Sequence, residues 1–141
     1  HVSEAFDGEG GRLHGGRWNS LGTRMVYTAG SSAGAILELL VHTEDYSSLE
    51  ALYCTFPVEF EDTLIESVSI VDLPMSWNNA EITSATQMIG DEWVESISSA
   101  VLRVPSAIDS DEVNYLINPA HEDLVKLGIG EPRALRIDPR L

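Results

Sequence analysis

Positive charge is absent from the middle of this chain, and this absence constrains how the two ends can be arranged. Between Tyr27 and Leu102 there are thirteen Asp and Glu residues and no Lys or Arg. Three arginines precede this stretch, and the other five bases follow Leu102. Any strongly basic site must therefore be assembled from the two ends of the chain. Such a site suits a small anionic ligand better than a polymer, although each arginine could also merely offset nearby surface acids.

The composition of the chain excludes several classes of protein. A length of 141 residues with 43% hydrophobic and 22% charged positions indicates one globular domain. The formal net charge of -15 would repel nucleic acids and anionic membranes, so neither is an expected partner. The single cysteine, Cys54, has no partner for an intramolecular disulfide, and no apolar run approaches the roughly 20 residues of a membrane span. The expected location is the cytoplasm.

The first third of the chain predicts a loop, a strand and a helix in that order. Residues 7–24 contain six glycines and indicate an ordered loop. The β-formers at 25–29 predict a short strand, after which a serine at 31 or 32 can cap a helix. The helix over 33–42 is apolar on almost every side, so we expect it to be largely buried.

The rest of the chain predicts more strands and one longer helix, which together indicate the α+β class in a single domain. Alternating apolar and polar residues predict strands within 52–60 and 64–73. A helix is expected over 82–98, with Ile82, Met88, Ile89, Trp93 and Ile97 on one apolar face. Further strands are expected within 101–108, 111–120 and 131–141.

Glu38 is the only charged residue within the apolar helical segment. A carboxylate among leucines and isoleucines carries a large desolvation penalty, so it should be paired with a cation, protonated or placed at the wall of a cleft. The alternative is that Glu38 occupies the one exposed stripe of the helix. The bases nearest to Glu38 in the sequence lie within residues 7–24, which we call the glycine-rich segment. A cation from this segment could pair with the carboxylate, which favours a functional role for Glu38.

The glycine-rich segment offers an anion-binding arginine without matching a known nucleotide motif. Neither GxGxxG after a strand nor GK followed by Ser or Thr is present. Instead, Gly15 and Gly16 precede Arg17, whose guanidinium can bind a phosphate or carboxylate in a bidentate manner. A plain turn with Arg17 bridging surface acids is the alternative. No GxSxG motif surrounds Ser106, and the four histidines and one cysteine lack metal-ligand spacing, so we expect neither a serine hydrolase nor a metal site.

Four blocks in this order resemble the RES-domain family, which is named for its Arg, Glu and Ser. The blocks are GGRWNSLGTRMVYTA, AILELLVH, SSAVLRVPSAI and NYLINPAH, and GDEW and IDPRL extend the match over nearly the whole chain. The resemblance implies one RES domain over residues 1–141, with mixed sheets and flanking helices as in ADP-ribosyltransferases. Family members usually start with a further short strand that often bears a Tyr-Arg pair, and no such pair stands at the start of these residues.

The resemblance also implies the site residues. The family's arginine, tyrosine, glutamate and serine correspond to Arg17, Tyr27, Glu38 and Ser106, and Asn118 matches the NPAH block. Arg17, Tyr27 and Glu38 are expected to be catalytic. NAD+ is expected to contact Arg17 and Tyr27 and, in addition, the residues Trp18, Ser106 and Asn118.

The implied function is that of a toxin in a bacterial type II toxin-antitoxin system. Such a toxin consumes NAD+ without a metal, by cleaving the nicotinamide-ribose bond and transferring ADP-ribose to a protein, water or phosphate. Its expected partner is an antitoxin with an Xre-like helix-turn-helix domain. The alternative is a catalytically silent acidic module that engages a basic protein, with Glu38 and Arg17 forming a structural ion pair.

Overall fold

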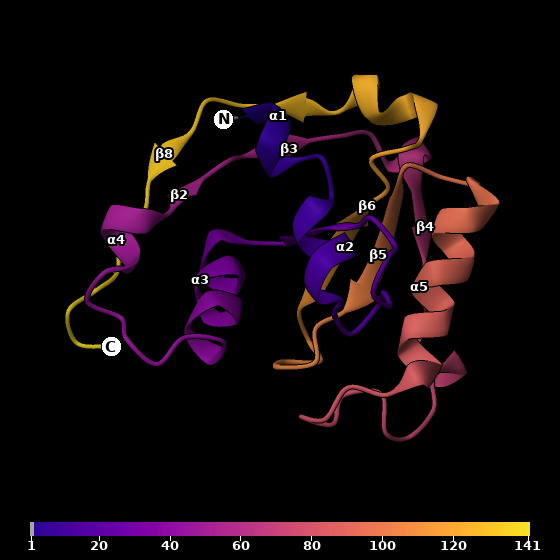
Figure 1. Ribbon diagram of the computed structural model, residues 1–141, viewed down its shortest axis with the longest axis horizontal. Helices are drawn as coiled ribbons and strands as arrows, with labels where there is room; N and C mark the ends of the chain where they lie inside the picture. The colour runs from indigo at the N-terminus through magenta and orange to yellow at the C-terminus, as the bar shows by residue number, and fades with distance from the viewer. Residues whose placement is uncertain (1) are drawn as a thin grey trace.

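A four-stranded mixed sheet forms the centre of the computed structural model, which describes residues 2–141 (Figure 1). The strand order is β1 (Val26–Ala29), β6 (Val113–Ile117), β5 (Val101–Pro105) and β4 (Ile65–Ser67). Strand β4 is parallel to β5, and the other two pairings are antiparallel. These strands confirm the expected strand positions, although each strand is shorter than its predicted segment.

Figure 1 shows the two longer helices apart from each other, with α3 (Ser32–Val41) to the left of the central strands and α5 (Ser84–Ser96) to their right. Helix α3 follows β1 directly, and the side chain of Ser31 accepts the backbone N–H of Gly34 as an N-terminal cap. Helix α5 packs through Trp93 against Leu102 of β5 and Leu116 of β6, and it confirms the helix expected over 82–98. The shorter elements are α1 (Val2–Ala5), α2 (Glu9–His14), α4 (Leu49–Leu52), η1 (Asp62–Leu64), η2 (Ile70–Asp72) and η3 (Glu122–Lys126).

Strand β5 is buried on both faces because alternate residues pack into different hydrophobic clusters. Leu102 and Val104 belong to the cluster that contains Trp93 of α5. Val101 belongs to the second cluster, together with Phe6 from the N-terminal part of the chain. The sheet is therefore covered on both sides, which fixes its position relative to α5.

Two small antiparallel pairs connect the middle of the chain with its C-terminal part. Strand β2 (Cys54–Thr55) pairs with β8 (Arg133–Ala134), and β3 (Val58–Glu59) pairs with β7 (Gly128–Ile129). We call the segments 54–59 and 128–136 the strap. Figure 1 shows the strap running away from the central sheet toward α4, on the side of the molecule where α3 lies.

The prediction that the helix over 33–42 is largely buried was wrong. Helix α3 has the expected position, but none of its residues is buried. Leu37 is 42% exposed and Val41 is 57% exposed. An apolar pattern indicates that a helix is able to bury most of its surface, but it does not show that the rest of the domain covers that surface. Helix α3 therefore leaves apolar side chains exposed to a ligand or a partner.

Two further predictions needed correction. Residues 7–24 do not form a loop throughout, because α2 spans Glu9–His14 between Gly8 and Gly15, both of which have positive φ.

The face predicted for α5 was also wrong in part. Ile82, Met88 and Ile97 are exposed, whereas the residues that α5 buries are Thr86, Gly90 and Trp93.

The burial of Gly90 predicts an unusual response to a Gly→Ala change within a helix. A Cβ atom at this position would lie 1.6 Å from the carbonyl oxygen of Trp18, so the backbones of α5 and the glycine-rich segment would have to separate. Gly90→Ala should lower the free energy of unfolding in urea by about 3 kcal/mol, as overpacking does.

Gly10 provides the matched control, since a Cβ atom there meets nothing within 4 Å. Gly10→Ala should be neutral or stabilising by about 0.5–1 kcal/mol, which is the ordinary helical effect. Equal effects of the two changes would contradict the close approach of α5 to Trp18.

Candidate functional site

A cavity of about 1580 Å³ lies between α3, β1, the glycine-rich segment and the strap. This volume exceeds the roughly 300–1,000 Å³ of typical small-molecule pockets. Arg17 lines the cavity from the N-terminal part of the chain, and Arg133 and Arg136 line it from the C-terminal part. The two ends of the chain thus supply arginines to one cavity. This arrangement agrees with the sequence, in which residues 28–101 contain no Lys or Arg.

Glu38 of α3 stands in the wall of this cavity and is held through one of its two oxygens. Oε1 accepts hydrogen bonds from Ser106 Oγ at 3.2 Å and from Asn114 Nδ2 at 3.0 Å. Within residues 2–141 no hydrogen bond to Oε2 is formed. Two neutral donors therefore orient the carboxylate, and its second oxygen remains available to a ligand.

Arg17 lies near Glu38 without pairing with it. Its Nη1 donates to the carbonyl oxygen of Trp77 at 2.8 Å, which fixes the side chain. Burial lowers the pKa of the Arg17 guanidinium, and the negative charge of Glu38 acts in the opposite direction. Among the ion pairs of the described residues none joins Arg17 to Glu38 within 4.0 Å. The guanidinium can therefore bind an anion that enters the cavity.

Asn19 holds the loop that carries Arg17. It is fully buried, and its Nδ2 donates to the carbonyl oxygens of Gly11 at 2.8 Å and Thr23 at 2.9 Å. Its Oδ1 accepts the hydroxyl of Tyr27 at 2.5 Å, and that hydroxyl in turn accepts the backbone N–H of Trp18 at 3.0 Å. These bonds attach the loop to β1.

Helix α5 holds the same loop from the other side. Asp91 accepts both the backbone N–H of Ser20, at 3.0 Å, and its hydroxyl, at 2.6 Å. Gln87 Nε2 donates to the carbonyl oxygen of Gly16 at 3.1 Å. The loop beside Arg17 is therefore clamped between β1 and α5. The sequence motif GDEW contained Asp91, but nothing in its spacing indicated this contact.

The structure brings most of the predicted site residues together. Glu38, Arg17, Tyr27 and Trp18 all line the cavity. Trp18 is only 3% exposed and packs mainly in the core. Ser106 contacts the site through Glu38, since its hydroxyl donates to that carboxylate.

Asn118 is a predicted site residue that neither lines the cavity nor contacts Glu38, whereas Ser106, which is also outside the lining, reaches Glu38. Asn118 is fully buried, and its Nδ2 donates to the carbonyl oxygen of Val94 in α5. The asparagine that reaches Glu38 is instead Asn114, four residues earlier on β6. Asn114 was not predicted, although the alternation of β6 placed it and Leu116 on a common face of the strand.

Within residues 2–141 no helix combines the length and apolar character needed to cross a membrane. In the same part of the chain no three His, Cys, Asp or Glu side chains are grouped so that they could hold a metal ion.

Comparison with known proteins places the chain in a family. The model of the RES domain matches residues 1–138. A protein of Yersinia enterocolitica named Toxin Res is 37% identical over 142 residues, which cover 100% of this chain and 93% of that protein. The chain therefore belongs to the RES-domain family.

Two further matches concern a relative and a fold. A protein of a Sphingobium species named Prs ADP-ribosylating toxin is 33% identical over 144 residues, covering 100% of this chain and 89% of that protein. A chain in the crystal structure of the M. tuberculosis MbcT-MbcA toxin-antitoxin complex superposes with a TM-score of 0.71 at 18% identity, covering 91% of this chain and 75% of that chain. The expected α+β class, with mixed sheets and flanking helices, is confirmed.

The hydroxyl of Tyr27 is hydrogen-bonded to Asn19 and Trp18, although 42% of the residue is exposed, and it predicts a pH-dependent contribution to stability. Burial raises the pKa of this phenol, so the folded protein keeps a proton that the unfolded chain releases near pH 10. The free energy of unfolding should therefore decrease as the pH rises above about 10. Tyr27→Phe should lower this free energy by about 1–3 kcal/mol at neutral pH and make the decrease above pH 10 shallower.

Tyr53 provides the control, since within residues 2–141 its hydroxyl makes no hydrogen bond, unlike that of Tyr27. Tyr53→Phe should leave the free energy of unfolding at neutral pH close to that of the wild type in urea titrations. Parallel pH curves for Tyr27→Phe and the wild type would show that folding does not raise the pKa of the Tyr27 hydroxyl.

Proposed function

We propose that this RES-domain protein is the toxin of a bacterial toxin-antitoxin system and that it cleaves NAD+ in the cytoplasm, transferring ADP-ribose to an acceptor. The observation that carries the proposal is the state of Glu38. Its carboxylate is fixed by Ser106 and Asn114 through Oε1, whereas Oε2 makes no hydrogen bond within residues 2–141. The Sphingobium relative, which is named for ADP-ribosylation, supports the choice of reaction.

The chemistry requires a fixed negative charge beside the ribose. The bond between the nicotinamide nitrogen and the ribose C1′ breaks with its electron pair leaving on nicotinamide, so positive charge develops on the ribose. An oxygen or nitrogen of the acceptor then adds to C1′, and the proton that this atom carried is released to solvent. A preorganised carboxylate stabilises the charge that exists only in the transition state. In this proposal Glu38 Oε2 accepts the ribose 2′-hydroxyl, which keeps the carboxylate beside C1′.

The other residues bind and orient the substrate. Arg17 supplies a cation for a phosphate oxygen of NAD+, and the 42% exposed ring of Tyr27 offers a stacking surface for nicotinamide. Ser106 and Asn114 position Glu38. Trp18 and Asn118 support these elements mainly from the core.

The alternative is a catalytically silent acidic module that engages a basic protein. It assigned Glu38 and Arg17 to a structural ion pair, and the contacts of these two residues give that role no support. The two side chains line one cavity but are not paired within 4.0 Å in the described part of the chain. We therefore favour the enzyme.

Substitution of Glu38 tests this proposal directly. Glu38→Gln keeps the size of the side chain but removes its charge, so nicotinamide release from NAD+ should slow by about 100–1000-fold. Glu95→Gln, on the exposed surface of α5, makes the same chemical change and should leave the rate unchanged. Release is measured by liquid chromatography on variants whose circular dichroism matches the wild type. No release by the wild type with any acceptor would disprove the enzymatic function.

The acceptor is identified by mass spectrometry of the products. Free ADP-ribose indicates water, ADP-ribose 1″-phosphate indicates phosphate, and a mass increment on a protein indicates transfer to that protein. The name of the Sphingobium relative favours a protein acceptor.

We further propose that an antitoxin with an Xre-like domain covers α3. Leu37 and Val41 are one helical turn apart and exposed, and Val41 lines the cavity. Exposed apolar surface of this kind marks interaction sites. The net charge of -15 favours a basic partner, and the structural match to a toxin-antitoxin complex supports a neutralising one.

Substitutions on α3 test this interface. Leu37→Asp combined with Val41→Asp should weaken binding of the purified cognate antitoxin by more than about 100-fold, because two apolar contacts are replaced by charges. Val125→Asp, at a position that is 88% exposed on η3, should leave the affinity unchanged. Equal affinities in calorimetric titrations would place the antitoxin elsewhere.

A further inference from the structure

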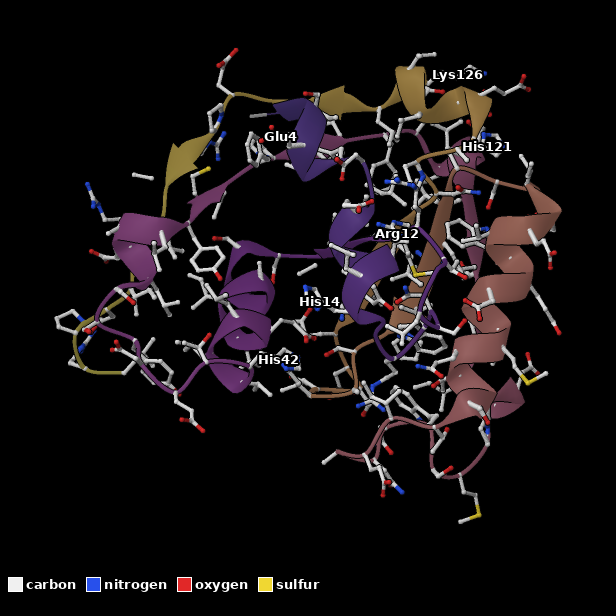
Figure 2. All side chains as sticks on the ribbon, viewed as in Figure 1. Glu4, Arg12, His14, His42, His121 and Lys126 are labelled. Atoms are coloured by element: carbon white, nitrogen blue, oxygen red, sulfur yellow. The ribbon has the colours of Figure 1, made fainter. Side chains whose placement is uncertain are left out.

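Four of the eight Lys and Arg side chains of this protein form ion pairs with carboxylates. Arg12 and Arg24 both pair with Glu9, Lys126 pairs with Asp123, and Arg140 pairs with Asp138. Figure 2 shows two of these cations, Arg12 on α2 near the middle of the view and Lys126 on η3 at its upper edge. These four bases are thus engaged with the protein's own acids.

The other four basic side chains have no carboxylate oxygen within 4.0 Å in residues 2–141. They are Arg17, Arg103, Arg133 and Arg136. Three of the four, all except Arg103, line the same cavity. Acids outnumber bases 23 to 8 in this chain, so arginines without a carboxylate partner are notable in themselves. Their convergence on one cavity indicates a ligand that supplies the missing negative charge.

Arg133 and Arg136 belong to the strap, which is fixed by contacts that leave both guanidinium groups free. Arg133 pairs through its backbone with Thr55 of β2. Leu135 between them is 3% exposed and anchors the segment. Just beyond Arg136, the carboxylate of Glu50 accepts the backbone N–H of Ile137 at 2.6 Å instead of pairing with an arginine. The strap therefore presents two guanidinium groups on a held backbone.

We propose that Arg133 and Arg136 form a phosphate-binding subsite on the strap, separate from Arg17 and supplied by a different wall of the cavity. Two guanidinium groups three residues apart can bind the oxygens of a phosphate or diphosphate by charge-assisted hydrogen bonds. The cavity volume of about 1580 Å³ leaves room for a ligand that spans from Glu38 to the strap. The phosphate belongs either to the diphosphate of NAD+ or to a phosphate-bearing acceptor, and this choice rests on the proposed function.

Binding of inorganic pyrophosphate tests the subsite independently of catalysis. Isothermal titration compares the wild type with the Arg133→Gln/Arg136→Gln double variant and with Arg103→Gln. The last is the matched control, since Arg103 also lacks a carboxylate partner but lies outside the cavity lining, where it donates to Ser67. The double variant should bind pyrophosphate at least about tenfold more weakly than Arg103→Gln. Wild-type binding should weaken with added NaCl, because both arginines are exposed.

The Michaelis constant for NAD+ then distinguishes the two sources of phosphate. A rise of about tenfold in KM with kcat retained assigns the subsite to the diphosphate of NAD+. Loss of pyrophosphate binding with KM unchanged assigns it to a phosphate group of the acceptor.

Two results would overturn the subsite: no binding of pyrophosphate to the wild type, or equal binding by the double variant and Arg103→Gln. An inactive wild type that still binds pyrophosphate through Arg133 and Arg136 would reject the NAD+ reaction while retaining the subsite.

Discussion

The attachment of Glu38 to two strands is the interaction on which the arrangement of the site depends. Helix α3 buries none of its residues, so packing alone does little to orient it. The contacts of Oε1 with Ser106 and Asn114 tie α3 to the end of β5 and to β6. The same contacts aim a carboxylate into the cavity. One hydrogen-bonded carboxylate at the cavity wall thus both positions the helix and prepares the charge that the proposed reaction requires.

Close contacts between backbone segments hold the loop that carries Arg17, the cationic part of the site. Gly90 lets α5 approach the Trp18 carbonyl, and Gly16 leaves space for the Tyr27 hydroxyl, which a Cβ atom would meet at 2.6 Å. Asn19 then occupies the space between the loop and β1 with both polar atoms of its side chain hydrogen-bonded. Glycines that suggest flexibility in the sequence therefore produce a tightly held loop. Arg17 projects from this loop, so its position relative to Glu38 is set by the core.

The sequence predicted elements better than it predicted their environments. The apolar run and Ser31 located α3 correctly, because capping and helical pattern are local properties. Its exposure was missed because burial depends on what covers a helix, including molecules outside this chain. Helix α2 was missed because Gly10 and Gly11 are poor helix formers, and only the approach of Gly11 to the backbone of Met25 explains a glycine there. Asn114 was missed for a related reason, since its partner Glu38 lies 76 residues away in sequence.

The central claim is that the free oxygen of Glu38 faces the ribose of a bound dinucleotide. A crystal structure of the Glu38→Gln variant soaked with NAD+ tests this claim most directly, because the slowed reaction preserves the substrate. The account predicts the nicotinamide ribose within hydrogen-bonding distance of residue 38 and a phosphate beside Arg17 or the strap arginines. A dinucleotide bound outside this cavity, or with its ribose turned away from α3, would contradict it.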